Sequence, residues 1–345
     1  MVTVGIIGYG LSGRIFHCAI INAVEGFKIK KIVTRDPHRK KQALVDFPDA
    51  TVVDIPEEVF TDTEIDLVVV CTPNTMHAEL AGKAILAGKN VVIEKPFTVT
   101  SKEGEQLLKV AKKAGKQITV YQNRRLDSDF RTVCKVIELG KLGKLVEFES
   151  HFDRFRPEIK PNVWREEPLP GSGNLYDLGA HLIDQALILF GIPNEVYGDI
   201  RCQRNGKVDD NFEVILYYPD LKVTLKSSAL VKEPLPRFIL QGTRGSYVKY
   251  GLDVQEEHLK DGLRPVDKSW GAEPVSLWGI LHTIDEKTVI ESEHGDYRDF
   301  YRNVYNSLVN GEEMMVKGED ALSVIRVIEA AMKSNVEKKR VAIRL

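Results

Sequence analysis

Residues 2–17 read VTVGIIGYGLSGRIFH, and this stretch decides the fold. It begins with a short, mainly apolar run, Val2–Ile7, which is typical of a strand buried in a parallel sheet. Glycines follow in the spacing G-x-G-x-x-G, and a helix is expected directly after them. Gly8 permits a tight turn, Gly10 lets the backbone approach a pyrophosphate, and Gly13 lets the helix pack closely on the strand. Because a helix N-terminus offers N–H groups to phosphates, the stretch predicts a dinucleotide site; the alternative is a glycine turn without a ligand.

Strands and helices alternate outward from this turn as far as residue 122. Several expected strands are unbroken Val/Ile runs, and Gly88 and Gly115 end two of the helices. The pattern predicts right-handed crossovers and a doubly wound parallel sheet, the Rossmann fold, over residues 1–122. The expected strands are Val2–Ile7, Lys28–Val33, Ala50–Val53, Leu67–Val70, Asn90–Ile93 and Gln117–Tyr121, and the expected helices are Arg14–Val24, His38–Phe47, His77–Ala87 and Lys102–Ala114.

Residues 123–345 follow a different pattern. Polar and apolar residues alternate with period two along several segments, as in antiparallel strands with one wetter face. The sequence therefore predicts a second, α+β domain with an open, mostly antiparallel sheet, whose last helix is a candidate to pack back on the first domain. The stretch Asp253–Glu293 is expected to be loop-rich and poor in strands. The expected strands are Leu145–Asp153, Glu195–Arg204, Asn211–Tyr218, Lys222–Ala229, Phe238–Gln241 and Val341–Leu345, and the expected helices are Asp129–Leu139, Leu175–Phe190 and Glu319–Ser334.

Length and composition exclude several classes of protein. The chain has 345 residues, more than one hydrophobic core usually organises, so two domains are expected. A formal net charge of -2 gives no reason to expect nucleic acid as a partner, and no run of about 20 apolar residues is present to span a membrane. Four scattered cysteines without a CxxC pair favour a reducing compartment. No basic region precedes the apolar run Val2–Ile7, so we expect no signal peptide and a cytoplasmic protein.

The end of the second expected strand bears on the choice between NAD and NADP. An NAD site usually has Asp or Glu there, to bind the ribose 2′-hydroxyl. The chain instead has Thr34 and Arg35, which are suited to donate to a 2′-phosphate or, for Arg35, to stack on adenine. The alternative is that Asp36 is the acid, shifted by two positions, and that the basic residues after it form a solvated helix face. The sequence favours NADP over NAD.

Three residues outside the glycine turn are candidates for chemistry. Lys95 follows the strand Asn90–Ile93, at the edge where open α/β sheets bind ligands, and its ammonium is suited to stabilise an alkoxide; the alternative is a surface lysine neutralised by Glu94. Asp177 and His181 are four residues apart on an expected helix and therefore share a face. Histidine is the natural acid–base near neutral pH, and a carboxylate can orient it, although a structural His–Asp pair is the alternative. No cluster of residues has the spacing of a metal site.

Together these motifs resemble those of the Gfo/Idh/MocA oxidoreductases, a family named for glucose–fructose oxidoreductase and inositol dehydrogenase. The resemblance covers essentially the whole chain, because the motifs stand in the family's order: the glycine turn, Cys-Thr-Pro-Asn at 71–74 with His77, Glu-Lys-Pro at 94–96, and Gly-Ser-Gly-x-Leu-x-Asp-x-Gly-x-His-x-Ile-Asp at 171–184. It implies a Rossmann domain followed by an open α/β domain whose sheet often mediates oligomers. We therefore expect a homo-oligomer, a dimer or a tetramer.

The same resemblance implies functional residues. Lys95, Asp177 and His181 would form the catalytic set. The expected cofactor site combines the turn, the end of the second strand and the residues that the resemblance adds, namely Gly8, Gly10, Leu11, Ser12, Gly13, Thr34, Arg35, Thr72, Pro73, Asn74, His77, Glu94, Lys95, Asn123, Trp164 and Arg165.

Two segments are similar to one branch of the family, the NADP-dependent scyllo-inositol dehydrogenases and their uncharacterised bacterial relatives. They read YQNRR at residues 121–125 and ESHFDRFRP at residues 149–157. His151 and Asp153 alternate on an expected strand, so both are candidates to hydrogen-bond a polyol; polar side chains on a sheet surface are the alternative.

The expected activity is reversible oxidation of a secondary alcohol of a sugar or cyclitol, similar to scyllo-inositol, by hydride transfer to NAD(P). His181 would take the hydroxyl proton, Lys95 would stabilise the alkoxide-like transition state, and Asp177 would position the substrate or the imidazole. Three alternatives stay open: a dehydrogenase for another sugar or a dihydrodiol, an NAD-dependent glycosidase, and a non-enzymatic NADP-sensing regulator on the same fold.

Overall fold

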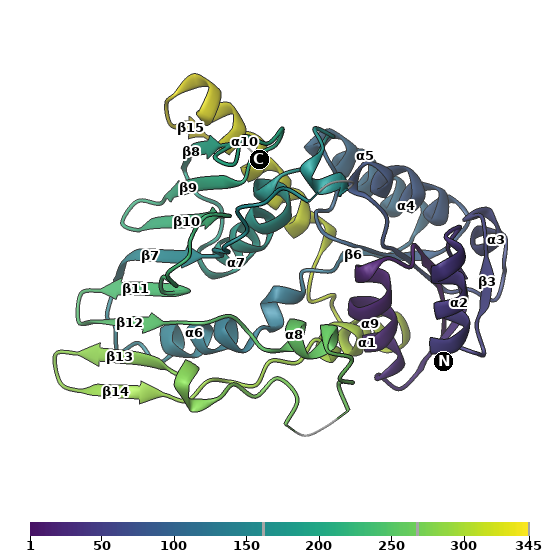
Figure 1. The fold of residues 1–345 in the computed structure, drawn as a ribbon, viewed down its shortest axis with the longest axis horizontal. Helices are drawn as coiled ribbons and strands as arrows, with labels where there is room; N and C mark the ends of the chain where they lie inside the picture. The colour runs from purple at the N-terminus through teal and green to yellow at the C-terminus, as the bar shows by residue number, and fades with distance from the viewer. Residues whose placement is uncertain (161–162, 267–268, 344–345) are drawn as a thin grey trace. The chain divides into compact units, whose positions relative to one another are not determined.

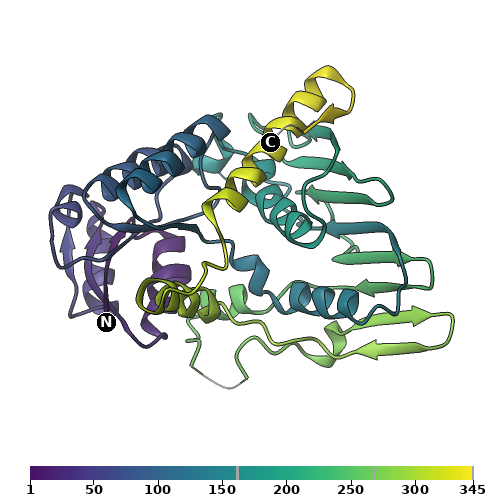
Figure 2. The same ribbon diagram turned by 180° about the vertical axis from the view of Figure 1, so that it is seen from behind.

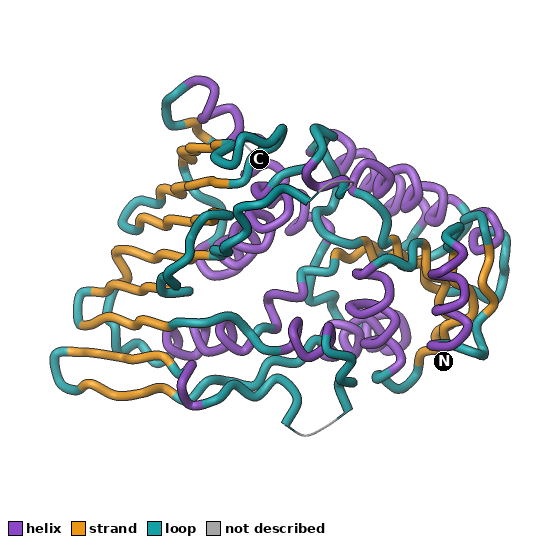
Figure 3. The backbone as a smooth tube through the Cα atoms, viewed as in Figure 1, coloured by secondary structure: helices purple, strands orange, loops and turns teal. Residues whose placement is uncertain are grey.

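The structure is a computed structural model that describes residues 1–160, 163–266 and 269–343. The chain folds into two compact units. Unit 1 consists of Met1–Asn123, Gln255–Trp270 and Tyr297–Leu322, and unit 2 consists of Arg124–Val254, Gly271–Asp296 and Ser323–Leu345. Each unit is built around a sheet of its own (Figures 1 and 3).

Unit 1 contains a six-stranded parallel sheet. In spatial order its strands are β3 (Thr51–Val53), β2 (Phe27–Val33), β1 (Val2–Ile7), β4 (Leu67–Val70), β5 (Asn90–Ile93) and β6 (Ile118–Val120). All four residues of β4 are buried, which explains the unbroken valine runs of the sequence. The order of the strands turns back between β1 and β4, and open sheets bind ligands outside the carboxyl ends of the strands at such a point. The predicted doubly wound sheet is confirmed.

Helices cover both faces of this sheet. The longer ones are α2 (Pro37–Asp46), α4 (His77–Leu86), α5 (Ser101–Ala114) and α9 (Arg298–Asn310), and the short ones are α1 (Ala19–Asn22), α3 (Glu57–Phe60) and α8 (Gln255–Lys260). Figures 1 and 2 show α4 and α5 on one face, and α1 and α9 on the other. Thr100 and Glu103 form a capping box at the start of α5, and Gly115, with a φ of 64°, ends it. Local sequence therefore sets the ends of this helix.

Residues 297–322 complete unit 1, although they stand far along the chain. The Tyr301 hydroxyl lies 2.6 Å from Nδ1 of His17, and both side chains are fully buried. The Thr119 hydroxyl, on β6, donates to the Val316 carbonyl at 2.7 Å. The sequence pattern places this segment in the second domain, because the aromatic residues of a helix do not indicate which sheet that helix covers.

Unit 2 contains a nine-stranded mixed sheet. In spatial order its strands are β14 (Lys287–Ile290), β13 (Gly279–Thr283), β12 (Gly245–Lys249), β11 (Phe238–Gly242), β7 (Leu145–His151), β10 (Lys222–Ser228), β9 (Asn211–Tyr217), β8 (Glu195–Arg201) and β15 (Val341–Ala342). Only β7 and β10 pair in parallel, and the other neighbours are antiparallel. Buried and part-exposed residues alternate along β9, as the period-two pattern predicts. The open, mostly antiparallel sheet is confirmed.

The stretch Asp253–Glu293, expected to be loop-rich and poor in strands, contains two strands that the sequence pattern does not predict. It contains α8 and the hairpin β13–β14, which extends the sheet beyond β12. No residue of the four-residue strand β14 is buried, so no apolar face marks this strand in the sequence. Of the expected strand Val341–Leu345, β15 covers the first two residues, and positions 344–345 lie outside the described residues.

Helices of unit 2 pack on one face of its sheet. They are α6 (Ser128–Glu138), the π-helical segment η5 (Leu175–Gly179) and, continuous with it, α7 (Ala180–Phe190). The ring centroids of Phe130 and Phe238 lie 6.5 Å apart, and those of Phe190 and Phe148 lie 5.2 Å apart, so α6 and α7 cover the same face. Figure 2 shows both helices in front of the strands.

The last helix, α10 (Gly318–Glu337), begins in unit 1 and continues in unit 2. Leu322, in its first turn, lies close to Gly104 of α5, because a Cβ on that glycine would be 3.0 Å from the leucine side chain. In the described part of the chain, none of the helices combines the length and the apolar character that crossing a lipid bilayer requires.

Candidate active site

The glycine turn of unit 1 connects β1 to η1 (Ser12–Cys18), a π-helical segment. Gly8 has a φ of 102°, and a Cβ there would lie 2.6 Å from the Cys71 carbonyl oxygen. A Cβ on Gly13 would lie 2.1 Å from the Gly8 carbonyl oxygen, so the helix packs on the turn only because that side chain is missing. At Gly10 a Cβ would meet only Nη1 of Arg39, at 3.9 Å, so this part of the turn is open to a ligand. The spacing predicts the steric roles seen at Gly8 and Gly13, and the approach of a pyrophosphate to Gly10 stays a prediction.

Glu94, directly after β5, joins that strand to the glycine turn. Its Oε1 accepts a hydrogen bond from the Ser12 hydroxyl at 2.6 Å and lies 3.6 Å from Nε2 of His17. Burial alone would raise the pKa of this carboxyl, but the hydrogen bonds and charges of His17, Lys95 and Ser12 outweigh burial and lower the pKa to about 2. Glu94 is therefore a carboxylate at neutral pH, and it holds the start of η1 against β5.

His77 links the loops that follow β4 and β5. Its Nδ1 lies 2.8 Å from the Pro96 carbonyl and its Nε2 lies 3.0 Å from the Thr72 carbonyl, with the ring fully buried. Burial lowers the pKa of His77 against the opposing effect of these carbonyls, so the neutral ring offers one N–H to two acceptors. The predicted cofactor residue His77 therefore holds the two loops in place from within the unit.

The loop after β4 contributes the predicted residues Thr72, Pro73 and Asn74. Pro73 is exposed, whereas Asn74 is buried at the start of a short 3-10 helix, η2 (Asn74–Met76). The hydroxyl oxygen of Thr72 is buried and makes no hydrogen bond in the structure. Buried hydroxyls normally have a partner, so this group fits a ligand bound at the strand ends.

Lys95 and Asn123 complete the predicted set of unit 1. Lys95 follows β5 and is partly exposed, and Asn123 is buried at the start of η3 (Asn123–Leu126), after β6. The strands β1, β4, β5 and β6 are parallel neighbours, so their carboxyl ends lie at one edge of the sheet. The structure therefore brings the glycine turn, the Thr72 loop and both residues to the same edge.

The end of β2 carries the residues that bear on NAD and NADP. Thr34 is buried and its N–H donates to the Val53 carbonyl, whereas Arg35 is exposed. Asp36 caps α2: its Oδ1 accepts the Arg39 N–H at 2.9 Å, and this hydrogen bond is the main reason why the pKa of Asp36 is lowered. Asp36, the alternative ligand for the ribose, therefore caps the start of α2.

A dinucleotide fits this arrangement. The turn is open at Gly10, Leu11 is exposed, and the Thr72 hydroxyl lacks a partner. Two exposed arginines, Arg35 and Arg39, flank the position where an NAD site usually has an acid. In the sequence, Arg39 is only one member of a basic helix face, and its place beside Gly10 becomes visible in the fold. These residues would hold the phosphates of the cofactor.

Asp177 and His181 lie on one continuous helix of unit 2, in η5 and in the first turn of α7. His181 is 5% exposed, while Asp177 is half-buried and accepts a hydrogen bond from Nε of Arg165 at 3.2 Å. The Arg165 guanidinium also lies 4.5 Å from the ring centroid of Trp164, in the short helix η4 (Trp164–Glu166). The structure therefore groups Asp177, Arg165 and Trp164 through direct contacts. Asp177 lies in a π-helical segment, and π-helical insertions often mark functional sites. Lys95, by contrast, belongs to unit 1.

The second turn of α7 is fixed by buried partners that the sequence pattern does not reveal. Asp184 forms a two-fold hydrogen-bonded ion pair with Arg125, at 2.7 and 2.8 Å. Gln185 donates to the Arg124 carbonyl at 2.8 Å and accepts from Nη2 of Arg237 at 3.1 Å. Both ion-paired side chains are buried, so the pair is a strong constraint on the position of the helix.

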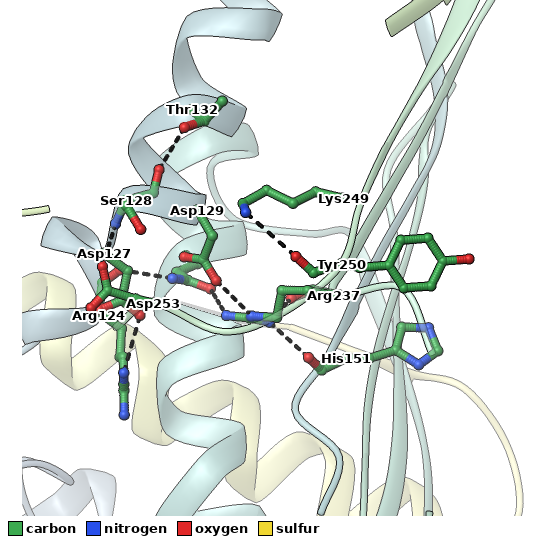
Figure 4. Close-up of polar contacts among 12 residues, drawn as sticks. Arg124, Asp127, Ser128, Asp129, Thr132, His151, Arg237, Lys249, Tyr250 and Asp253 are labelled. Carbon is green, nitrogen blue, oxygen red and sulfur yellow. Dashed lines mark hydrogen bonds and ion pairs between the residues drawn. The ribbon is translucent and has the colours of Figure 1, made fainter. Parts of the chain in front are cut away.

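Arg237 lies between α6 and the sheet, as Figure 4 shows. Its Nε donates to Oδ2 of Asp129 at 3.1 Å, and its Nη1 donates to the Ser150 hydroxyl at 2.6 Å. Burial lowers the pKa of Arg237, while the charge of Asp129 raises it. This pair joins α6, β7 and β11 beside α7.

His151 and Asp153 lie on the other face of the unit 2 sheet. Phe148 contacts α7, and three residues further along β7 the side chain of His151 points the opposite way. Figure 4 shows the His151 ring beyond the strands, away from Arg237. Nδ1 of His151 lies 3.4 Å from Oδ2 of Asp153, and both residues line a cavity of about 240 Å³. The structure therefore places both residues on the sheet face opposite α7, and their contact with a polyol stays a prediction.

Known proteins resemble the chain over its whole length. Residues 2–122 match an oxidoreductase family described as having an NAD-binding Rossmann fold, and residues 135–343 match the C-terminal alpha/beta domain of the same family. The chain is 41% identical to scyllo-inositol 2-dehydrogenase (NADP(+)) IolW of Bacillus subtilis, over 99% of this chain and 95% of that relative. It is 40% identical to the uncharacterized oxidoreductase YdgJ of Escherichia coli, over 96% of each.

A solved structure gives the same result for the fold. The yvaA protein of Bacillus subtilis superposes with a TM-score of 0.96 at 40% identity, covering 99% of this chain and 98% of that one. The two domain matches point to one family, and the glycine turn and the two sheets are consistent with it. The chain therefore belongs to the Gfo/Idh/MocA oxidoreductase family and is an NAD(P)-dependent oxidoreductase.

Proposed function

We propose that this dehydrogenase, which acts on CH–OH groups, oxidises a secondary alcohol of a cyclitol or sugar, with scyllo-inositol as the first candidate. The similarity to scyllo-inositol 2-dehydrogenase (NADP(+)), 41% over 99% of the chain, carries the proposal. The chain also has Lys95, Asp177 and His181 at the positions that the family resemblance assigns to catalysis. A polyol is therefore the expected small-molecule partner.

The three residues divide the chemistry between them. His181 takes the proton of the reacting hydroxyl, and Lys95 stabilises the negative charge that develops on the alcohol oxygen. Asp177, hydrogen-bonded to Arg165, orients the substrate or the imidazole. Bound NADP supplies the two-electron acceptor, so the alcohol becomes a ketone, with NADPH and one proton as the other products.

We assign NADP rather than NAD as the cofactor. Thr34 stands where an acid would bind the ribose 2′-hydroxyl, and the exposed Arg35 and Arg39 offer positive charge for a 2′-phosphate. Asp36, the alternative acid, uses Oδ1 to cap α2. The relative IolW is NADP-dependent by name, which agrees with this assignment.

We further propose a homo-oligomer, a dimer or a tetramer, assembled through the open sheet of unit 2. The face of that sheet away from α7 carries ion pairs such as Lys226 with Glu213, at 3.2 Å.

All four cysteines are free, which supports a reducing compartment such as the cytoplasm.

A spectrophotometric screen tests the proposed activity. The purified chain is incubated with inositol isomers and common sugars, with NAD and with NADP in parallel, and formation of reduced cofactor is followed by absorbance. We expect NADPH to form with scyllo-inositol, and the His181→Asn variant serves as the blank. If another sugar or a dihydrodiol is oxidised and no inositol isomer is, that compound replaces scyllo-inositol as the proposed substrate. Release of an aglycone without net NADPH overturns the dehydrogenase activity.

A further inference from the structure

The helix that carries Asp177 and His181 is not capped by its own preceding residue. Asn174, directly before η5, makes no side-chain hydrogen bond to the helix start. Instead Oδ2 of Asp209, on the loop between β8 and β9, accepts the Leu175 N–H at 2.7 Å. The Asp209 carbonyl oxygen accepts the Asn174 N–H at 3.0 Å. Asp209 therefore supplies acceptors to two successive N–H groups that a helix start leaves unpaired.

Gly173 makes room for the Asp209 carboxylate. This glycine has a φ of 89°, and a Cβ on it would lie 2.0 Å from Oδ1 of Asp209. Its carbonyl accepts the Asp177 N–H at 3.1 Å, and its N–H donates to the Arg165 carbonyl at 3.3 Å. Gly173 therefore connects the Asp209 carboxylate to Asp177 and to Arg165, which donates a hydrogen bond to Asp177.

Asp209 caps this helix start at a cost in stability. Burial raises the pKa of Asp209 to about 6, and the nearby Asp210 adds to the rise, although backbone hydrogen bonds oppose it. The ionised group therefore lowers the stability of the folded chain at neutral pH. An uncharged cap, such as Thr100 at α5, accepts the same kind of hydrogen bond without that penalty. Asp210 is engaged elsewhere, because it accepts two hydrogen bonds from Arg204.

We propose that Asp209 is a positioning residue of this dehydrogenase, whose carboxylate fixes the π-helical turn η5 and so the direction in which Asp177 faces the reacting alcohol. A π-helical turn departs from the regular hydrogen-bond pattern of the α-helix, so its geometry depends on the groups that hold its first N–H. The inference rests on the proposed catalytic role of Asp177 and His181.

Three variants test the inference. Asp209→Ala should lower kcat for scyllo-inositol with NADP by about 10- to 100-fold, because a small misplacement of a catalytic group has a large effect, while the KM for NADP stays unchanged. Asp209→Asn keeps an oxygen acceptor for the Leu175 N–H and should restore kcat to within about threefold of the parent chain. Thr100→Ala, the matched control, removes the cap of α5 and should lower the unfolding midpoint without lowering kcat.

A second readout does not depend on turnover. The His181 ring-proton resonance, identified by its loss in His181→Asn, should shift in Asp209→Ala and return in Asp209→Asn, while Thr100→Ala leaves it in place. Unchanged kcat and an unchanged resonance in Asp209→Ala overturn the inference, as does an Asp209→Asn variant as impaired as Asp209→Ala. If the parent chain does not oxidise scyllo-inositol, that result counts against the proposed substrate, and the resonance alone decides the role of Asp209.

Discussion

Thr34 stands at the end of β2, where a carboxylate would bind the ribose 2′-hydroxyl and repel a 2′-phosphate. Because the exposed Arg35 is next to it, we expect Thr34→Asp to lower kcat/KM for NADP by at least about tenfold and to shift the preference toward NAD. Steady-state kinetics with each cofactor measure the ratio. Asp36→Asn is the control, since Asp36 caps α2 and its replacement should leave the ratio unchanged. An unmoved preference in Thr34→Asp contradicts the NADP assignment.

Lys95 and His181 carry the proposed charge stabilisation and proton transfer. Lys95→Met and His181→Asn should each lower kcat by about 100-fold or more, because they remove charge stabilisation and proton transfer. Binding of NADPH, followed by its fluorescence, should change little in His181→Asn. The matched controls are Lys83→Met and His282→Asn, which change exposed side chains away from these positions. Near-normal turnover in Lys95→Met or His181→Asn would remove that residue from the mechanism.

At the residue scale, the sequence predicts what local geometry determines. The role of Gly13 follows from the spacing of the turn, because a Cβ on it would meet the carbonyl of Gly8 in the same turn. The partners of the functional residues are not predictable in this way. Asp209 is 34 residues from the Leu175 that it caps, and Arg125 is 59 residues from Asp184. A single sequence does not predict which distant residues the fold brings into contact.

At the scale of elements, η5 and its carboxylate make the stability of the chain depend on pH. The pKa of Asp209 is raised to about 6 in the folded chain, chiefly by burial. In the unfolded chain it is about 3.9, so between these values the folded state holds more protons, and the free energy of unfolding falls as pH rises. Above the pKa of Asp209 in the folded chain, its contribution to the free energy of unfolding no longer changes with pH.

We expect this effect in urea unfolding of the parent chain and of Asp209→Asn. The free energy of unfolding of the parent minus that of the variant should decline from about pH 4 to about pH 6 and then stay level. The subtraction removes every other titrating group that the two chains share. A difference that rises with pH across this window is incompatible with a buried carboxyl that retains its proton.

Elements with a buried apolar face could be predicted, and those without one could not. The runs that form β1, β4 and β5 are buried and apolar, so period and composition agree with the structure. β14 lies at the edge of its sheet, with no buried residue, and β12 and β13 pair it to the core through backbone hydrogen bonds that any sequence can make. β12 and β13 are held in place by pairing with neighbouring strands, which a local sequence pattern does not reveal.

At the scale of the whole molecule, unit 1 needs three separate segments. Residues 1–123 contain the complete parallel sheet, but Tyr301 and the Val316 carbonyl contact His17 and Thr119 from a segment near the other end of the chain. We therefore expect a fragment of residues 1–123 to unfold without a cooperative transition and to bind ANS, because it exposes this apolar face.

The control is a single chain in which linkers join residues 1–123, 255–270 and 297–322. It should recover a cooperative thermal transition by near-ultraviolet circular dichroism. Cooperative unfolding of the short fragment alone contradicts the expectation. The change of pattern near residue 122 gives no sign that residues 255–270 and 297–322 belong to unit 1, because their apolar residues fit either sheet.

The chain passes between the units after residues 123, 254, 270, 296 and 322. A single crossover between the genes of two relatives therefore cannot exchange the nucleotide-binding unit for another, because every crossover point divides at least one of the two cores between the parents. A working chimaera would need three matched pieces of each parent.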